Sequence, residues 1–186
     1  MMRKALLLID IQKTFRDGSW GERNNDAAEN NASRLLASFR EHGDLVIHVQ
    51  HKSQNPNSRF YVKNEGVGFQ DSVLPLDGEQ LISKSVNSAF IGTYLQDYLE
   101  ENGVSTLVIA GLTTPHCVST TTRMASNLGY KTYLVEDATA SFALQNHQGK
   151  TFSPQDVQEI SLATLHDEFA VIVSTDDVIK HYHQLN

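Results

Sequence analysis

The sequence predicts an α/β fold of three layers, α/β/α, built on a six-stranded parallel sheet. Short apolar runs rich in leucine, isoleucine and valine alternate along the chain with segments whose apolar residues recur at helical spacing. Glycine follows several of the helical segments, as it commonly does where a helix ends. Strands that alternate with helices favour a parallel sheet with right-handed crossovers, and the common strand order is 3-2-1-4-5-6.

The first strand and the first helix are separated by a loop. Residues 4–9 form an apolar run, typical of a strand buried on both faces, which ends at Asp10. The first helix spans residues 26–42, and Gly43 ends it. Because open α/β sheets place their chemistry at the carboxyl ends of the strands, the Asp10 carboxylate is a candidate for the active site.

A long irregular segment follows the second strand, which spans residues 45–49. Asparagine, glycine, serine and proline are spread over residues 51–76 with no sustained period. A loop of this length inside a compact domain is commonly functional. We interpret it as the wall or lid of a pocket, and a plain surface excursion is the alternative.

The second half of the chain continues the alternation. A short strand over residues 79–83 has Lys84 just past its end, and Ser88 is a good N-cap for a helix that continues to Asn102. The remaining elements are a strand at 106–110, a helix from Cys117 that Gly129 closes, a strand at 132–135, a helix at 153–166, a strand at 169–173 and a final helix at 176–183.

Length and composition bound the function. With 186 residues the chain is most simply one domain, residues 1–186, that buries a full core. A single cysteine, no apolar run long enough to span a membrane and no signal-peptide pattern indicate a cytoplasmic protein. The net charge of -7 argues against a nucleic-acid partner. We therefore expect a small-molecule substrate and neither a nucleic-acid nor a membrane partner.

The only cysteine, Cys117, lies where a strand turns into a helix. Gly111 ends the strand, and apolar residues recur at helical spacing from Cys117 onward, so the thiol belongs to the first turn of the helix. Backbone N–H groups and the helix dipole stabilise a thiolate there, and we expect a thiol pKa below the free value of roughly 8.5. The alternative is a buried cysteine that acts as a small hydrophobic residue.

A carboxylate, an ammonium and a thiol follow the ends of three predicted strands. With the common strand order, Asp10 and Cys117 lie side by side at the topological switch point, and Lys84 lies in the same half of the sheet. The carboxylate can take the thiol proton and later return it to a leaving group, while the lysine favours both anions. These three residues are the candidate catalytic set.

Five segments of the chain resemble the isochorismatase-like cysteine hydrolases, a family that includes nicotinamidases and N-carbamoyl amidohydrolases. The segments are 6–15 (LLLIDIQKTF), 82–95 (ISKSVNSAFIGTYL), 108–130 (VIAGLTTPHCVSTTTRMASNLGY), 134–142 (LVEDATASF) and 153–175 (SPQDVQEISLATLHDEFAVIVST). They cover the chain nearly end to end and follow the family order. The resemblance implies an isochorismatase-like, Rossmann-like fold and a hydrolase.

The resemblance also implies how the reaction proceeds. It assigns an Asp-Lys-Cys triad to Asp10, Lys84 and Cys117, and a cis peptide bond to Leu112-Thr113. It places the oxyanion hole at the N–H groups of Thr113 and Cys117. The expected function is hydrolysis of amide or ureido C–N bonds in small molecules, through a thioester on Cys117.

The chain departs from the nicotinamidases of this family after the second strand. Those enzymes bind a metal through an Asp-x-His cluster, whereas this chain has VIHVQHKSQNP at that place. Without the aspartate we expect no metal and no cofactor, and we interpret His48 as a satisfied core histidine. Isochorismatases, which cleave a vinyl ether without an acyl-enzyme, are an alternative, as is a non-catalytic binding module of the same fold.

Several residues near the candidate triad are candidates for substrate contacts. They are Gln12, Phe15, Trp20, His51, Phe60, Tyr61 and His116. A packing role is the alternative for these side chains. Members of the family commonly assemble as dimers or tetramers, so the resemblance also implies a homo-oligomer.

Overall fold

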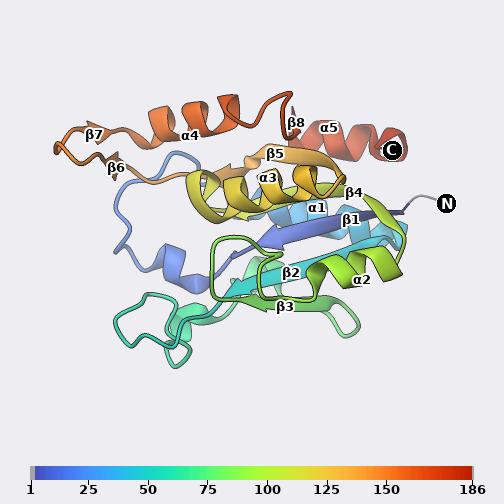
Figure 1. Ribbon diagram of the computed structural model, residues 1–186, viewed down its shortest axis with the longest axis horizontal. Helices are drawn as coiled ribbons and strands as arrows, with labels where there is room; N and C mark the ends of the chain where they lie inside the picture. The colour runs from blue at the N-terminus through green and yellow to red at the C-terminus, as the bar shows by residue number, and fades with distance from the viewer. Residues whose placement is uncertain (1–2, 186) are drawn as a thin grey trace.

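The computed structural model describes residues 3–185, and a six-stranded parallel sheet forms its centre (Figure 1). The strands stand in the order β3-β2-β1-β4-β5-β8. Their bounds are β1 Arg3–Ile9, β2 Leu45–His51, β3 Gln80–Lys84, β4 Val104–Leu112, β5 Lys131–Ala140 and β8 Val171–Val173. The predicted fold class and strand order are confirmed, with β8 as the sixth strand of the sheet.

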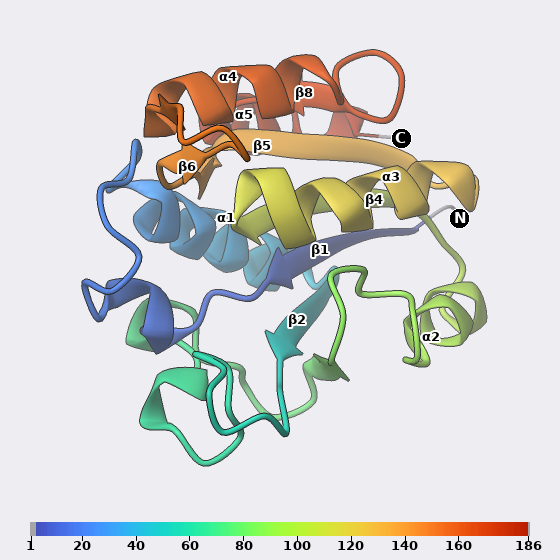
Figure 2. The ribbon, with the colours of Figure 1, turned by 60° about the vertical axis from the view of Figure 1, so that its left-hand side comes forward.

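Helices cover both faces of the sheet, which produces the three layers (Figure 2). Two helices cover one face, α1 Ala28–His42 and α5 Thr175–Lys180. Three helices cover the other, α2 Leu95–Glu101, α3 Ser119–Asn127 and α4 Pro154–Ala163. Each face therefore has its own hydrophobic core.

Strand β1 contributes to both cores. Ala5, Leu7 and Ile9 pack with the core on the α2 and α3 side, whereas Leu6 and Leu8 pack with the core on the α1 side. All five side chains are buried. Because side chains alternate across a strand, an uninterrupted apolar run suits a strand that is covered on both faces.

The carboxyl ends of the central strands meet at one edge of the sheet. Ile9 of β1 pairs with Gly111 of β4, and His51 of β2 pairs with Lys84 of β3. This register brings Asp10, which follows β1, close to the ends of the strands on both sides. The edge is therefore where the candidate catalytic residues gather.

The segment after β3 differs from the prediction. The helix predicted from Ser88 is wrong over its first half, because α2 begins only at Leu95. The Ser88 hydroxyl accepts a hydrogen bond from the N–H of Phe90 in a turn, and Gly92 has a φ of 70°, which an α-helix does not contain. Lys84, predicted just past β3, is its last residue.

A short antiparallel hairpin follows β5 and is missing from the prediction. It consists of β6 Leu144–Gln145 and β7 Thr151–Phe152. Strands of two residues are too short to show an alternating pattern, so sequence periodicity does not reveal them. Strand β5 itself continues to Ala140, beyond the predicted end at Val135.

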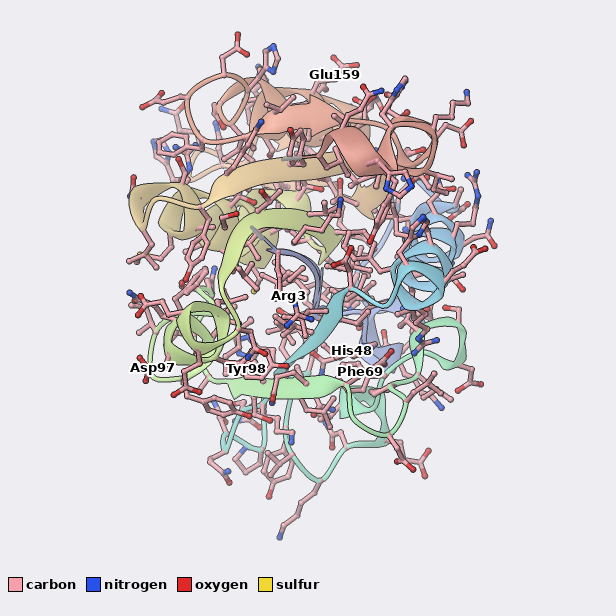
Figure 3. All side chains as sticks on the ribbon, turned by 90° about the vertical axis from the view of Figure 1, so that its right-hand side faces the viewer. Arg3, His48, Phe69, Asp97, Tyr98 and Glu159 are labelled. Carbon is pink, nitrogen blue, oxygen red and sulfur yellow. The ribbon has the colours of Figure 1, made fainter. Side chains whose placement is uncertain are left out.

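His48 is a buried core residue, as the sequence predicts. Its Nε2 lies 2.8 Å from Oε2 of Glu79, and its ring packs edge-on against Phe69 (Figure 3). Burial lowers the pKa of His48, so the imidazole is neutral at pH 7. Its Nδ1 has no hydrogen-bond partner among residues 3–185, so the histidine is only half satisfied.

None of the helices in the described part of the chain combines the length and the apolar character that crossing a bilayer requires.

Candidate active site

Asp10, Lys84 and Cys117 meet in a buried cluster at the carboxyl edge of the sheet. Nζ of Lys84 lies 2.7 Å from Oδ2 of Asp10 and 3.2 Å from Sγ of Cys117. The side chains of Asp10 and Lys84 are fully buried, and Cys117 is 9% exposed. The structure therefore brings together the three side chains that the sequence singles out.

The Asp10 carboxylate has one paired and one unpaired oxygen. The residue leaves β1 with a φ of 51°, a left-handed conformation that is uncommon outside glycine. Oδ2 accepts the hydrogen bond from Lys84, while Oδ1 is buried with no hydrogen-bond partner in the described residues. Burial raises the pKa of Asp10 above its ordinary value, and the Lys84 ammonium opposes this effect. Oδ1 is therefore free to accept a proton.

The Lys84 ammonium has more acceptors around it than protons to donate. Besides Asp10 and Cys117, it contacts Nδ1 of His51 at 3.0 Å and the carbonyl oxygen of Val86 at 3.2 Å. Burial and the Lys84 charge lower the pKa of His51 to about 4, so its imidazole is neutral at pH 7 and Nδ1 accepts. Four acceptors share three N–H groups, and sulfur is the weakest of them.

Cys117 lies in a wide helical turn that leads directly into α3. Thr114–Val118 form a π-helical turn, and α3 begins only at Ser119. Turns of this kind are rare and occur frequently at functional sites. The helical segment begins at Thr114, so Cys117 lies in its first turn as predicted, and only the π-helical form of that turn was not predicted.

The predicted fall in the thiol pKa is wrong. Burial and the Asp10 carboxylate raise the pKa of Cys117 to about 12, because together they outweigh the Lys84 ammonium. The sequence argument considered the helix dipole but not the loss of solvent around the sulfur. Cys117 is therefore a neutral thiol at pH 7, and it needs a base before it can attack a carbonyl carbon.

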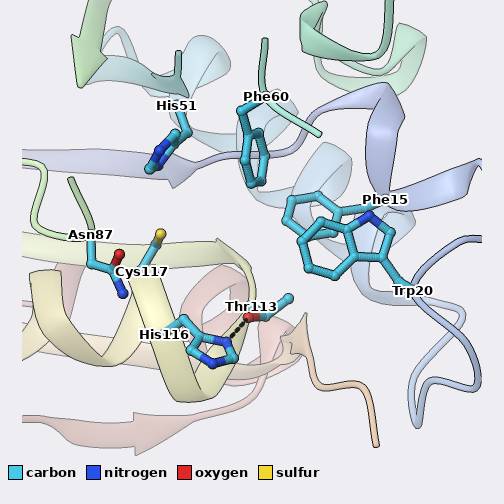
Figure 4. Close-up of a pocket in the computed structure, with 8 residues that line it drawn as sticks. All are labelled: Phe15, Trp20, His51, Phe60, Asn87, Thr113, His116 and Cys117. Atoms are coloured by element: carbon cyan, nitrogen blue, oxygen red, sulfur yellow. Dashed lines mark hydrogen bonds between the residues drawn. The ribbon is translucent and has the colours of Figure 1, made fainter. Parts of the chain in front are cut away.

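Side-chain hydrogen bonds hold the turn that carries Cys117. The peptide bond between Leu112 and Thr113 is cis, at the place that the resemblance indicates. Oγ1 of Thr113 lies 2.9 Å from Nδ1 of His116 (Figure 4). The Thr114 hydroxyl donates to the carbonyl oxygen of Ala140 at the end of β5. One hydrogen bond thus forms within the turn, and another joins the turn to the end of β5.

A cavity of about 220 Å³ opens beside the Cys117 thiol (Figure 4). Its lining side chains are Phe15, Trp20, His51, Phe60, Asn87, Thr113, His116 and Cys117. Five of these are predicted substrate contacts: Phe15, Trp20, His51, Phe60 and His116. The volume is below the roughly 300 Å³ at which pockets for drug-sized ligands begin, so it suits a small molecule.

Glu29 holds the loop that carries the aromatic residues of the cavity wall. The ring centroids of Phe15 and Trp20 are 4.7 Å apart, and both lie in the loop between β1 and α1. Glu29, buried in the first turn of α1, pairs with Arg16 at 2.6 Å and with Arg23 at 2.9 Å. These two arginines flank Trp20 in sequence, so Glu29 holds the loop that presents the aromatic rings.

Gln12 does not line the cavity, in contrast to the prediction. Its side chain is fully buried, and Nε2 donates to the carbonyl oxygens of His51 and Val67 at 3.0 and 2.7 Å. Its Oε1 accepts the N–H of His51 at 2.9 Å. The amide is fully used in joining the loop after β1 to the end of β2, which leaves nothing for a substrate.

Tyr61 also lies outside the cavity lining. Its backbone forms an isolated β-bridge with Ser53 in a loop otherwise made of turns. Phe60 lines the cavity, whereas Tyr61 is not among the lining residues. Asn87, by contrast, lines the cavity without having been predicted. Its place three residues after Lys84, within a segment that matches the family, was the available signal.

The side chains that could bind a metal ion already surround the ammonium group of Lys84. Ligand atoms of Asp10, His51 and Cys117 lie within 4.8 Å of one another, and the Lys84 ammonium contacts all three. The metal cluster of the nicotinamidases does not fit here, because His48 is buried against Glu79 on the other side of β2. The positive charge of this site comes from Lys84.

The arrangement provides the parts that acyl transfer needs. The Cys117 thiol lies at the wall of a small cavity, and Asp10 offers a buried oxygen that can hold a proton. The Lys84 ammonium contacts both groups, so it can balance a negative charge on either of them. Hydrolysis of a carbonyl compound is within the reach of this set.

Comparison with known proteins identifies the family. The Isochorismatase domain model matches residues 4–177. The isochorismatase family protein YrdC of Bacillus subtilis is 52% identical over 180 residues, which are 97% of this chain and 96% of that protein. A maleamate amidohydrolase from Pseudomonas putida is 30% identical over 140 residues, or 68% of this chain and 66% of that enzyme.

The structural similarity is equally extensive. A crystal structure of a hydrolase of the isochorismatase family from Chromobacterium violaceum superposes with a TM-score of 0.94 at 38% identity. The match covers 98% of this chain and 94% of the other. The family model covers most of the sequence, and the solved fold covers nearly all of it. The chain therefore belongs to the isochorismatase family and is a hydrolase.

Proposed function

We propose that this hydrolase cleaves amide or ureido C–N bonds of small molecules through a thioester on Cys117. The observation that carries the proposal is the shared contact of Lys84 with Asp10 and Cys117 at the wall of the aromatic cavity. A maleamate amidohydrolase among the relatives acts, by its name, on an amide, which supports the C–N bond as the target.

In the first step the thiol attacks the carbonyl carbon of the substrate. Oδ1 of Asp10 takes the thiol proton as the S–C bond forms, because the raised pKa of Cys117 leaves no thiolate in advance. The carbonyl electrons move onto oxygen, and the N–H groups of Thr113 and Cys117 form the oxyanion hole that holds the charge. Lys84 stays paired with the cluster throughout.

In the second step the tetrahedral intermediate collapses. The C–N bond breaks, the leaving nitrogen takes the proton from Asp10, and the acyl group remains on sulfur as a thioester. A water molecule then gives its proton to Asp10 and its oxygen to the thioester carbon. When the C–S bond breaks, the proton returns to sulfur, so the acid is released and the neutral thiol is restored.

The test is ammonia release from a panel of primary amides, N-carbamoyl compounds and nicotinamide. Wild-type protein should release ammonia from at least one member of the panel. Cys117→Ala should lose more than about 10⁴-fold in kcat, and Asp10→Asn about 10³-fold. Asp97→Asn, a change of an exposed carboxylate on α2, is the matched control and should retain activity (Figure 3).

Trapping the intermediate separates this scheme from vinyl ether hydrolysis. Hydroxylamine added during turnover should divert the acyl group to a hydroxamate, because it attacks a thioester readily. A protein that cleaves isochorismate, releases no ammonia from the panel and keeps its activity in Cys117→Ala would show the vinyl ether reaction instead. That result would overturn the proposal.

A further inference from the structure

A second cavity of about 190 Å³ adjoins the catalytic one. Three residues, Trp20, Thr113 and His116, line both cavities, so the two spaces share part of their wall. Leu144 of the β6–β7 hairpin and Phe142 form much of the outer wall. A substrate whose carbonyl carbon lies at Cys117 can therefore extend past Trp20 into an adjoining apolar space.

Arg59 is the only permanently charged residue among those that line the two cavities. The histidines of the lining, His51 and His116, are neutral at pH 7, because burial lowers the pKa of each. The chain as a whole carries a net charge of -7, so the positive charge of Arg59 at the cavities is opposite in sign to that of the whole protein. An anionic ligand would find its favourable electrostatic contact here.

The guanidinium of Arg59 is held in place by two contacts and forms no salt bridge with a described residue. Its Nη2 donates to the carbonyl oxygen of Ser19 at 2.8 Å, and its Cζ lies 4.2 Å from the centroid of the Trp20 ring. Within residues 3–185 its one hydrogen bond is to Ser19, and the nearby Asp17 carboxylate interacts with its charge without forming a salt bridge. Arginine has five N–H donors in a planar fork, so most of them face no protein acceptor.

The loop that carries Arg59 serves both cavities at once. Phe60 lines the catalytic cavity and Arg59 lines the adjoining one, while Trp20 lies against both side chains. The ring of Trp20 is held by the hydrogen bond from its Nε1 to the carbonyl oxygen of Thr14 at 3.0 Å. The charged group is thus fixed relative to the nucleophile by packed aromatic rings.

We propose that Arg59 is a specificity residue that binds a carboxylate at the end of the substrate remote from the scissile bond. The substrate class is an amide whose carbonyl is joined to a carboxylate by a short apolar spacer. The apolar side chains of Trp20, Phe142 and Leu144 contact the spacer, and the free N–H groups of Arg59 bind the carboxylate. This inference rests on the proposed amide hydrolysis for its reaction, but not for its binding.

Turnover of matched substrates tests the specificity. Half-amides of straight-chain dicarboxylic acids with three to six carbons are compared with the corresponding diamides, which are neutral and of equal length. Wild type should favour the half-amide by about 10- to 100-fold in kcat/KM at one or two spacer lengths. In Arg59→Gln this ratio should fall at least about tenfold, mainly through KM, and Arg59→Lys should recover only part of it.

A surface arginine provides the matched control. Arg34 on α1 pairs with Asp176 at 2.6 Å and lines neither cavity, and Arg34→Gln changes the net charge equally. The ratio of half-amide to diamide turnover should stay at the wild-type value in that variant. A ratio that is near one in wild type, or that is unchanged in Arg59→Gln, would overturn the inference while leaving amide hydrolysis intact.

Binding without turnover separates the two proposals. Trp20 is the only tryptophan of the chain, so its fluorescence in a Cys117→Ala background reports ligands in either cavity. Half-amides should bind at least about tenfold more tightly than diamides, and added salt should weaken only the half-amides. This binding preference, together with no ammonia release from the same half-amides by wild-type protein, would refute the proposed reaction and support the role of Arg59. Equal binding of both ligand types would refute the role of Arg59.

Discussion

Oδ2 of Asp10 accepts a 2.7 Å hydrogen bond from Nζ of Lys84, and both side chains are fully buried. The two residues lie at the ends of β1 and β3, which are separated in the sheet by β2. Two charges removed from water in this way contribute little net stability, but each becomes costly when the other is lost. Each side chain therefore stabilises the charged form of the other, and the Lys84 ammonium favours the ionised form of the carboxyl beside the thiol.

Lys84→Met should reveal that dependence. The variant leaves the Asp10 carboxyl without its cation, so the pKa of Asp10 rises further and a base is missing at neutral pH. We expect the free energy of unfolding to fall by about 3 to 5 kcal/mol and kcat to fall by about 10³-fold. Urea denaturation and ammonia release measure the two effects.

The double variant Asp10→Asn with Lys84→Met is the control for this prediction. It removes both charges, so no uncompensated ion remains buried, and about 2 kcal/mol of the lost stability should return. Activity should stay absent, because the proton acceptor is gone. A double variant less stable than Lys84→Met would contradict the account of the pair.

Alkylation of Cys117 by iodoacetamide should report the raised pKa directly, since the chain has no other cysteine. The rate should keep rising with pH through 9 and 10, with no plateau near the free-thiol value of roughly 8.5. In Asp10→Asn the thiolate loses its negative neighbour, so the rise should begin at lower pH. A wild-type plateau at or below pH 8 would show that the thiolate is stabilised after all.

The positions of Asp10 and Cys117 were predictable because they depend on patterns that the sequence displays. The apolar run before Asp10 and the strand that ends at Gly111 identify two buried parallel strands, and the common strand order makes them neighbours. Lys84 was different, since a lone lysine after a short strand is usually solvated. The expected strand order put it in the same half of the sheet, and the resemblance of its segment to the family raised it above an ordinary surface lysine.

Burial and irregular backbone account for what the sequence did not predict. The pKa of Cys117 depends on how completely neighbouring segments exclude water, which no local pattern records. Asn87 reaches the cavity from a turn that was expected to lie just before a helix. Gln12 has the same polar chemistry and a place nearer to Asp10, yet three backbone hydrogen bonds bind it elsewhere.

Gly111→Ala should damage the junction of β1 and β4. A Cβ at Gly111 would collide with the carbonyl oxygen of Ile9, the residue before Asp10, and would lie 2.6 Å from the Ile9 nitrogen. The φ of Gly111, 134°, also disfavours any side chain at this position. We expect a loss of at least about 3 kcal/mol in the free energy of unfolding, or failure to fold. Gly103→Ala is the matched change, because its φ of 65° is also positive but no atom lies within 4 Å of the new Cβ.

Comparing the two glycine variants separates the loss of stability caused by the clash with Ile9 from the loss caused by the positive φ. Gly103→Ala should cost only about 1 kcal/mol, since it carries the backbone penalty without a clash. Urea denaturation of both proteins gives the difference. Equal losses in the two variants would mean that β1 yields to the new methyl group, and that the close approach of the strands is not needed.

Glu29→Gln should loosen the loop that presents Phe15 and Trp20, and should do so in a pH-dependent way. Burial alone would raise the pKa of Glu29, but the hydrogen bonds and charge of Arg23 outweigh it and hold the pKa below the ordinary value of 4.5. A lowered folded-state pKa means that the unfolded chain binds the proton first as the pH falls. The stability from Glu29 is therefore fully present above pH 4.5 and is lost as the pH falls below it.

We expect Glu29→Gln to lower the free energy of unfolding by about 2 kcal/mol at pH 7, because Arg16 and Arg23 lose their shared carboxylate. The difference in free energy of unfolding between wild type and Glu29→Gln should become smaller as the pH is lowered from 5 to 3. Glu41→Gln, an exposed change at the other end of the same helix, should show no gap at either pH. A gap for Glu29→Gln that stays constant over this range would show that the carboxylate contributes through packing and not through its charge.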